Sequence, residues 1–190
     1  MSLPHPRIRT IVITLCCSLT ICAVVFIGER IRRRARIARI VAAGGTVFFL
    51  EDMGSGQRDL AVWFRGTVGV DSRVYVYDVR FNKALLSDRD WETLISFTEL
   101  AGLTLRGCEV SDERLQSLGV MHRLYHLSLS DTKVTDEPVT TLVAKLPRLG
   151  SLDLRGTAVS ESCITTLHDQ YPNLAIYSDG NCLPPCCWEG

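Results

Sequence analysis

The strongest constraint in this chain is a pattern of apolar residues that recurs between residues 100 and 177. The pattern starts at Leu100, returns at Leu124 and returns again at Leu149. Each copy has leucine at its first, fourth and sixth positions, then Cys or Thr, a valine and a Ser/Thr–Asp/Glu pair. Three copies that agree at nearly every apolar position predict a repeated structural unit.

The pattern of one copy predicts a strand, a turn and a helix. In the second copy Leu127 and Leu129 alternate with polar residues, which predicts a short strand with one buried face. Val139 and Leu142 follow at helical spacing, and we expect Asp136 to cap that helix with its carboxylate. One such unit cannot bury its own apolar face, so units must stack and share a core. The frame is that of a leucine-rich repeat, so the predicted fold class is α/β, a short solenoid of about four repeats.

Weaker copies flank the three clear ones. A shift back by one repeat brings Val76, Val79 and Phe81 into phase with the leucines. Leu174 begins a truncated copy, which we expect to close the end of the stack, as terminal repeats do. Before the repeats, residues 46–50 read as a strand, and residues 60–64 read as either a strand or a short helix. Both would cover the first strand of the repeats as an N-terminal α/β cap.

The amino-terminal part of the chain predicts a membrane anchor. Residues 10–28 contain no charged side chain. As a helix they would span about 28 Å, roughly one hydrocarbon core. A cleaved signal peptide is the competing interpretation, but no small-residue cleavage site follows the apolar run closely. The cysteines inside it are expected to behave as small apolar residues, with lipidation as an alternative.

Arginines follow the apolar segment and are expected to lie at the membrane surface. They are Arg30, Arg32, Arg33, Arg34, Arg36 and Arg39. Each is expected to gain about 1 kcal/mol near an anionic leaflet. By the positive-inside rule they also favour a cytoplasmic location for the repeats. Nucleic-acid binding is the alternative for a basic run, but no aromatic residues interleave with the arginines and the net charge of the chain is zero.

The segments together predict this order along the chain: a polar tail over residues 1–9, a transmembrane helix over 10–28, a basic juxtamembrane helix over 29–45, an N-terminal cap over 46–75, repeats over 76–181 and a Cys-rich tail over 182–190. We expect the juxtamembrane helix to stop at Gly44 and Gly45, because glycine adopts the left-handed conformation past a helix end at little cost.

This order resembles a group of membrane-anchored bacterial leucine-rich-repeat proteins, most of them of unassigned function. The resemblance lies in the apolar anchor, the arginine-rich helix that ends in Ala-Gly-Gly45, the Val-Phe-Phe strand and units of the form Leu-Arg-Gly-x-x-Val-Ser/Thr-Asp/Glu. The segment 106–112 also resembles the cysteine-containing repeat subclass found in F-box proteins, although Thr132 and Thr157 stand where that subclass has cysteine. The resemblance implies the fold and a membrane location.

The polar residues of the predicted strands form the candidate binding face, because stacked repeats align them into rows on a concave surface. They are Asp78, Arg80, Asn82, Thr104, Arg106, His126, Ser128, Ser130, Ser151, Asp153 and Arg155, with Gly102 among them. The alternative is a plain solvated sheet face without a ligand.

Three other groups of residues invite a chemical interpretation. His122 and His126 have the i, i+4 spacing of metal ligands on a helix, but the repeat frame places His126 in a strand. Cys163 with His168 and Asp169 suggests a nucleophile, but a small buried side chain is expected at the Cys163 position of the repeat. The thiols of the Cys-rich tail lack a histidine, and two of them are adjacent, which disfavours one metal site. We therefore predict no catalytic residue, no metal and no cofactor.

The sequence thus predicts a non-enzymatic, membrane-tethered leucine-rich-repeat module that binds a protein partner, with no nucleic-acid ligand. A structural protein of the membrane surface without a discrete partner is the first alternative. A thiol-dependent or metal-dependent enzyme that uses the carboxy-terminal cysteines is the second. The identity of the partner and the oligomeric state do not follow from the sequence.

Overall fold

The computed structural model of the chain describes residues 24–29, 31–50, 75–179 and 182–183. The chain divides into two compact units, residues 1–39 and residues 40–190. In the first unit, residues 24–29 and 31–39 are helical. No helix within the described ranges is long and apolar enough to cross a membrane, and residues 10–23 of the predicted transmembrane helix lie outside those ranges.

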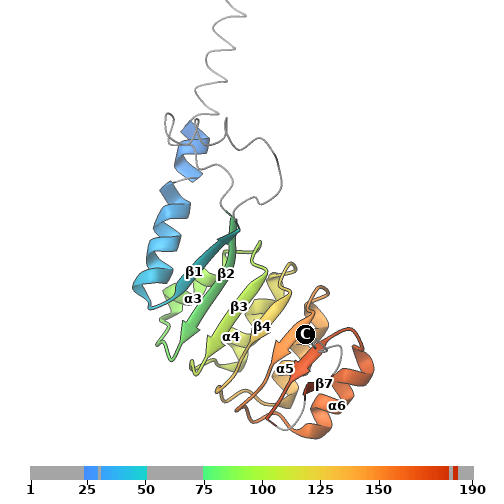
Figure 1. Cartoon of the computed structure of the whole chain (residues 1–190). Coiled ribbons are helices and arrows are strands. Elements are labelled where there is room, and N and C mark those ends of the chain that lie inside the picture. The colour runs from blue at the N-terminus through green and yellow to red at the C-terminus, as the bar shows by residue number, and fades with distance from the viewer. Residues whose placement is uncertain (1–23, 30, 51–74, 180–181, 184–190) are drawn as a thin grey trace, which may run out of the picture. The chain divides into compact units, whose positions relative to one another are not determined.

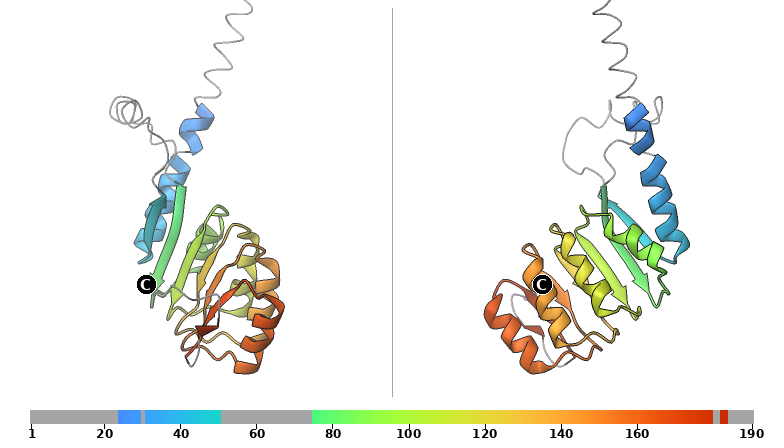
Figure 2. Two further views of the ribbon diagram at one scale, coloured as in Figure 1. Left: turned by 45° about the vertical axis from the view of Figure 1, so that its right-hand side comes forward. Right: turned by 180° about the vertical axis from the view of Figure 1, so that it is seen from behind.

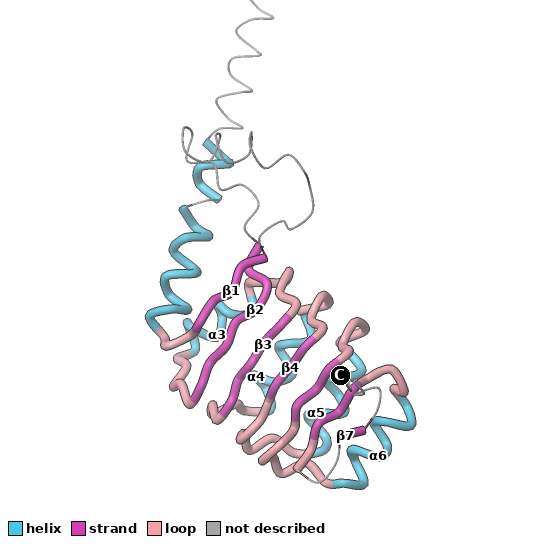
Figure 3. Tube along the Cα trace, in the orientation of Figure 1, coloured by secondary structure: helices cyan, strands magenta, loops and turns pink. Residues whose placement is uncertain are grey.

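The second unit is an α/β structure in which strands of a single sheet alternate with helices, so the predicted α/β class is confirmed (Figure 1, Figure 3). In the described part, seven strands lie in sequence order across the sheet. They are β1 (Thr46–Leu50), β2 (Tyr75–Asn82), β3 (Gly102–Arg106), β4 (His126–Ser128), β5 (Ser151–Asp153), β6 (Ala175–Tyr177) and β7 (Cys182–Leu183). Neighbours from β2 to β6 are parallel, and β1 and β7 pair antiparallel at the two ends.

The helices that follow the strands lie on one face of the sheet, as the view from behind shows (Figure 2). They are α3 (Asp88–Ile95), α4 (Asp112–Ser117), the 3-10 helix η1 (Leu118–Val120), α5 (Asp136–Lys145) and α6 (Glu161–Gln170). Each α-helix buries apolar residues at the predicted spacing, such as Leu94, Leu115, Leu142 and Leu167. The core therefore lies between the helices and the sheet.

The register of the sheet follows the period of the sequence pattern, because paired residues are one repeat apart. Leu103 pairs with Leu127 and Leu127 pairs with Leu152, so each leucine meets its equivalent in the next repeat. All three side chains are fully buried. Because the side chains of a strand alternate between faces, this register places the polar residues of the strands on the face opposite the helices.

A residue with positive φ recurs after each strand from β2 to β5. These residues are Lys83 (51°), Gly107 (63°), Asp131 (59°) and Gly156 (67°). Glycine carries no strain in this left-handed conformation, and aspartate tolerates it better than most residues. In the same turns the hydroxyls of Thr132 and Thr157 donate to the carbonyls of Leu129 and Leu154, both at 2.6 Å. Cys108 occupies the equivalent position and is buried.

The prediction that Asp136 caps α5 is wrong. The capping position belongs to the preceding Ser or Thr: Ser87, Ser111 and Ser160 each accept a backbone N–H of the first turn of their helix, whereas Thr135 makes no such bond. The Asp136 carboxylate instead accepts hydrogen bonds from the backbone N–H and the hydroxyl of Ser160, both at 2.7 Å. It therefore links two neighbouring strand–helix repeats.

Two features near the start of the second unit match the prediction. The helix ends after residue 42, and Gly44 has a φ of +85°, as expected of glycine past a helix end. Strand β1 is present and pairs with β2, as a cap of the first repeat strand should. Residues 51–74, which include the predicted element at 60–64, lie outside the described ranges.

Replacing Leu103 with alanine tests the shared core. Leu103 is fully buried, so the substitution should lower the free energy of unfolding by about 2–5 kcal/mol through loss of transfer energy and formation of a cavity. Thr104→Ala changes the next residue of the same strand, on the polar face, and should cost much less. Urea denaturation of the full chain in a mild detergent measures both values. Equal losses in the two variants would show that the register is wrong by one residue.

Candidate binding face

The side chains opposite the helices form what we call the polar sheet face, made of the strand residues that the sequence singled out. Parallel register aligns them into rows that cross the strands. One row contains Asp78, Gly102, His126 and Ser151. The next contains Arg80, Thr104, Ser128 and Asp153. The structure thus brings together residues that come from four different repeats of the sequence.

This face is only partly exposed. The side chains that reach solvent are those of Arg80, Asn82, Arg106 and Arg155. Those that are buried are Asp78, Ser128, Ser130 and Asp153. Thr104, His126 and Ser151 are half-buried. A plain solvated face would not bury two carboxylates, so the exposed arginines stand on a packed polar layer.

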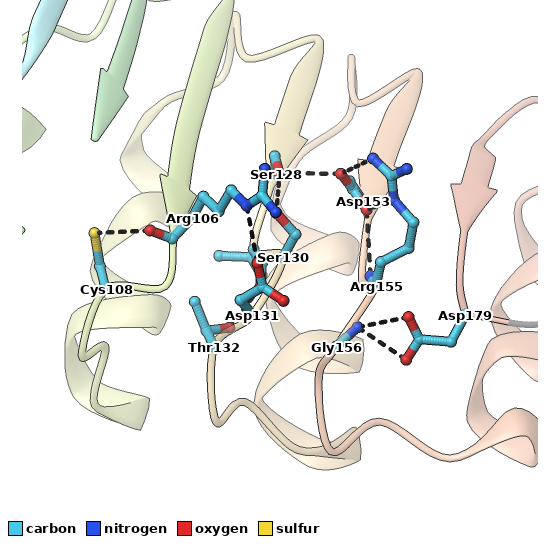
Figure 4. A network of polar contacts seen from close by, with 11 residues as sticks. Arg106, Cys108, Ser128, Ser130, Asp131, Thr132, Asp153, Arg155, Gly156 and Asp179 are labelled. Atoms are coloured by element: carbon cyan, nitrogen blue, oxygen red, sulfur yellow. Dashed lines mark hydrogen bonds and ion pairs between the residues drawn. The ribbon is translucent and has the colours of Figure 1, made fainter. Parts of the chain in front are cut away.

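Asp153 is the centre of one part of that layer (Figure 4). Its Oδ1 accepts from the backbone N–H of Arg155 at 3.2 Å and from Nε at 2.9 Å. Its Oδ2 accepts from Nη2 of Arg155 at 2.8 Å and from the hydroxyl of Ser128 at 3.2 Å. Burial alone would raise the pKa of Asp153, but these donors and the charge of Arg155 hold the pKa below its usual value. Asp153 is therefore an anion with both oxygens occupied.

The left-handed turn residues add further contacts between neighbouring strand–helix repeats. Nε of Arg106 donates to Oδ2 of Asp131 at 2.8 Å (Figure 4). The backbone N–H of Gly156 donates to both carboxylate oxygens of Asp179 at 2.9 Å. The Arg106–Asp131 pair is exposed, so its contribution to stability is small, about 0–1 kcal/mol. Its effect is to hold the Arg106 side chain in one position.

Asp78 forms a second buried ion pair. Its Oδ2 accepts from Nε of Arg80 at 2.8 Å and from Nη2 at 2.7 Å. The guanidinium of Arg80 also lies over the ring of Phe48 on β1, 4.5 Å from the centroid. Oδ1 of Asp78 is buried and accepts no hydrogen bond from any described residue.

His126 lies two strands from Asp78 in the same row, with Gly102 between them. Its Nδ1 is 2.9 Å from the hydroxyl of Ser151. Burial lowers the pKa of His126 and Arg80 adds to that effect, whereas Asp78 and Asp153 act in the opposite direction. A lowered pKa leaves the imidazole uncharged at neutral pH.

The residues considered for chemistry do not assemble into a site within the described ranges. His122 lies in the turn before β4 and His126 lies in the strand, so the pair is not on a helix, as predicted. Sγ of Cys163 on α6 is half-buried and lies 3.4 Å from the hydroxyl of Thr140. Described His, Cys, Asp and Glu residues form no group of three suited to a metal ion. Residues 184–190, with two of the tail cysteines, lie outside the description.

The predicted membrane-surface arginines belong to the helix of the first unit. Arg32 and Arg34 are exposed, whereas Arg33, Arg36 and Arg39 are half-buried. Arg30 lies outside the described residues.

In comparisons with known proteins, no family model matches the chain and no curated protein matches its sequence. The candidate site is therefore defined by its own geometry. Sequence reasoning missed two of its members, Asp131 and Asp179, because they follow the strands as turn residues. For Asp131 the available signal was its common phase with Gly107 and Gly156 in the repeat.

The Asp153 ion pair predicts a dependence of stability on pH. The folded protein holds the pKa of Asp153 below that of the unfolded chain, so its stabilising effect is present above about pH 4 and is lost as the pH falls through the folded pKa. Urea denaturation of the full chain from pH 7 to pH 2.5 should show this loss. Asp153→Asn should flatten the dependence, whereas Glu137→Gln, at an exposed position of α5, should leave it unchanged. A wild-type slope in Asp153→Asn would contradict the assignment.

Proposed function

We propose that the second unit is a short leucine-rich-repeat solenoid whose polar sheet face binds a protein partner. The observation that carries the proposal is the register, which aligns polar side chains from four neighbouring parallel strands on the face opposite the helices. Extended faces of this kind are the surfaces that solenoid proteins commonly use for binding.

The chemistry of the face supports a protein ligand. Arg80, Arg106 and Arg155 are each more than half exposed and each is held by a carboxylate. Such pairing orients the guanidinium before a partner arrives, which reduces the entropy lost on binding. Arginine is enriched at the centre of protein interfaces, where its several N–H groups and its planar surface are both used.

We further propose that residues 10–28 tether this module to a membrane, with the arginines that follow at the anionic surface. The support is the uncharged run itself and its basic flank. The same flank favours a cytoplasmic position for the repeats. The proposed function is thus a non-enzymatic, membrane-tethered interaction module.

Photocrosslinking in native membranes tests the binding face. A photoreactive residue at Asn82 or Thr104 places the probe on the polar sheet face, and one at Thr141 or Thr165 places it on exposed positions of α5 or α6. We expect a discrete adduct of one partner from the first pair alone. Adducts from both pairs at equal yield, or from neither, would favour the alternative of a structural membrane-surface protein without a discrete partner.

Sedimentation with membranes tests the anchor. Removal of residues 1–28 should release the chain into the supernatant at about 1 M salt, where the attraction of the arginines to the membrane is screened. The full chain with Arg32, Arg33, Arg34 and Arg36 changed to glutamine should stay with the membrane in the same wash. Retention of the truncated chain at high salt would show that another segment is the anchor.

A further inference from the structure

Two Asp-x-Arg sequences on the polar sheet face differ in one respect. Asp78 with Arg80 on β2, and Asp153 at the end of β5 with Arg155 just after it, each bury a carboxylate beneath an exposed guanidinium. Asp153 also accepts from Ser128 on the neighbouring strand, so both of its oxygens are occupied. Asp78 has an arginine on Oδ2 and no donor among the described residues on Oδ1. Oδ1 of Asp78 is therefore an acceptor without a hydrogen bond from any described residue.

Neither neighbour of Asp78 in the sheet has a side-chain donor: one is Phe48 on β1 and the other is Gly102. It is the neighbour of Asp78 on β3, and as glycine it offers no side-chain donor. A Cβ at Gly102 would lie 2.9 Å from Cγ of Asp78 and 3.0 Å from Oδ1. The carboxylate thus lies over the glycine, on the side of the next strand, where His126 follows in the same row. Burying a carboxylate oxygen without a donor costs free energy that an incoming donor would recover.

His126 offers a second acceptor on the other side of Gly102. When the proton of the neutral imidazole is on Nδ1 and points at the Ser151 hydroxyl, Nε2 carries a lone pair. Burial, which lowers the pKa of His126, keeps the ring uncharged at neutral pH. Asp78 and His126 then present one anionic and one neutral acceptor about the same glycine.

We propose that Asp78 and His126, on either side of Gly102, form a seat for a lysine or arginine side chain of the protein partner. This inference rests on the proposed function, because it assigns one contact within the proposed binding face. The partner's cation donates to Oδ1 of Asp78 and to Nε2 of His126. Arg80 shows that this carboxylate holds a guanidinium on its other oxygen, against the ring of Phe48.

Access to the seat requires the Asp78 carboxylate to move, since Oδ1 is buried. Rotation of the carboxylate about its Cβ–Cγ bond then presents Oδ1 to the incoming group. The seat is thus closed in the free protein and opens as the cation arrives.

Acidification should lower the affinity of the seat for a cation. Protonated His126 is a donor and a cation, so it competes with the ligand for Asp78. The charged groups that act on His126 are Asp78, Asp153 and Arg80, and its neighbours on β3 and β5 are Gly102 and Ser151. Binding of a cation should therefore be strongest above the pKa of His126.

Titration of the full chain in a nonionic detergent with n-butylguanidinium or n-butylammonium tests the proposal. The readout is the set of imidazole ¹³C and ¹⁵N resonances of His126, assigned by their loss in His126→Asn. At pH 7.5 we expect saturable shifts, and binding of the neutral analogue n-butylurea should be weaker by about tenfold or more. The ¹⁵N shifts should also show Nε2 without a proton. The cation should bind more weakly once the pH falls below the pKa of His126.

Asp78→Asn should weaken n-butylguanidinium binding by about tenfold or more, whereas the matched Asp112→Asn, at an exposed position of α4, should leave it within about twofold. Equal weakening in both variants, absence of saturable shifts in the wild type, or a proton on Nε2 would each overturn the seat. The last two measurements need no variant, so they decide the matter even if Asp78→Asn fails to fold.

Crosslinking from the face without probe binding would overturn the seat and leave the proposed function standing. Probe binding without crosslinking would support the seat and overturn the function.

Discussion

The structure depends on the burial of apolar strand residues between neighbouring strand–helix repeats, the units of this stack. Leu103, Leu127 and Leu152 are each fully buried, and each is paired in register with its equivalent in the next unit. A short strand with one short helix cannot bury such side chains alone. The hydrophobic effect therefore acts on the stack as a whole, and the order of the strands follows the order of the sequence.

The same register decides what happens on the opposite face. Because side chains alternate along a strand, a core row that recurs once in every unit creates polar rows with the same period. Carboxylates in adjacent rows then meet different neighbours: that of Asp153 meets Ser128, whereas that of Asp78 meets Gly102. Polar chemistry on this face is therefore set by small differences between units that share one backbone.

Contacts between units also involve the turns that join strands and helices. Asp131 combines a left-handed backbone with an ion pair to Arg106 of the preceding unit, and Asp136 accepts two hydrogen bonds from Ser160 of the following one. The Ser160 hydrogen bonds, from its side chain first and its backbone second, lower the pKa of the Asp136 carboxyl. Such contacts link adjacent units in sequence order, which is how stability passes along a stack.

The sequence by itself determined the α/β class, the phase of the strands and helices, and the residues of the polar sheet face, because these follow from the period of the apolar residues. It also predicted that the first helix stops at the Gly44–Gly45 pair, where Gly44 has a left-handed φ. The tertiary structure decided which of the polar residues are buried, and that Asp136 bonds to Ser160 rather than capping its own helix. It also left Oδ1 of Asp78 without a donor among the described residues. The reason is physical: periodicity reports which side of a strand a residue occupies, whereas hydrogen-bond partners depend on side chains that are close in space but a whole repeat away in sequence.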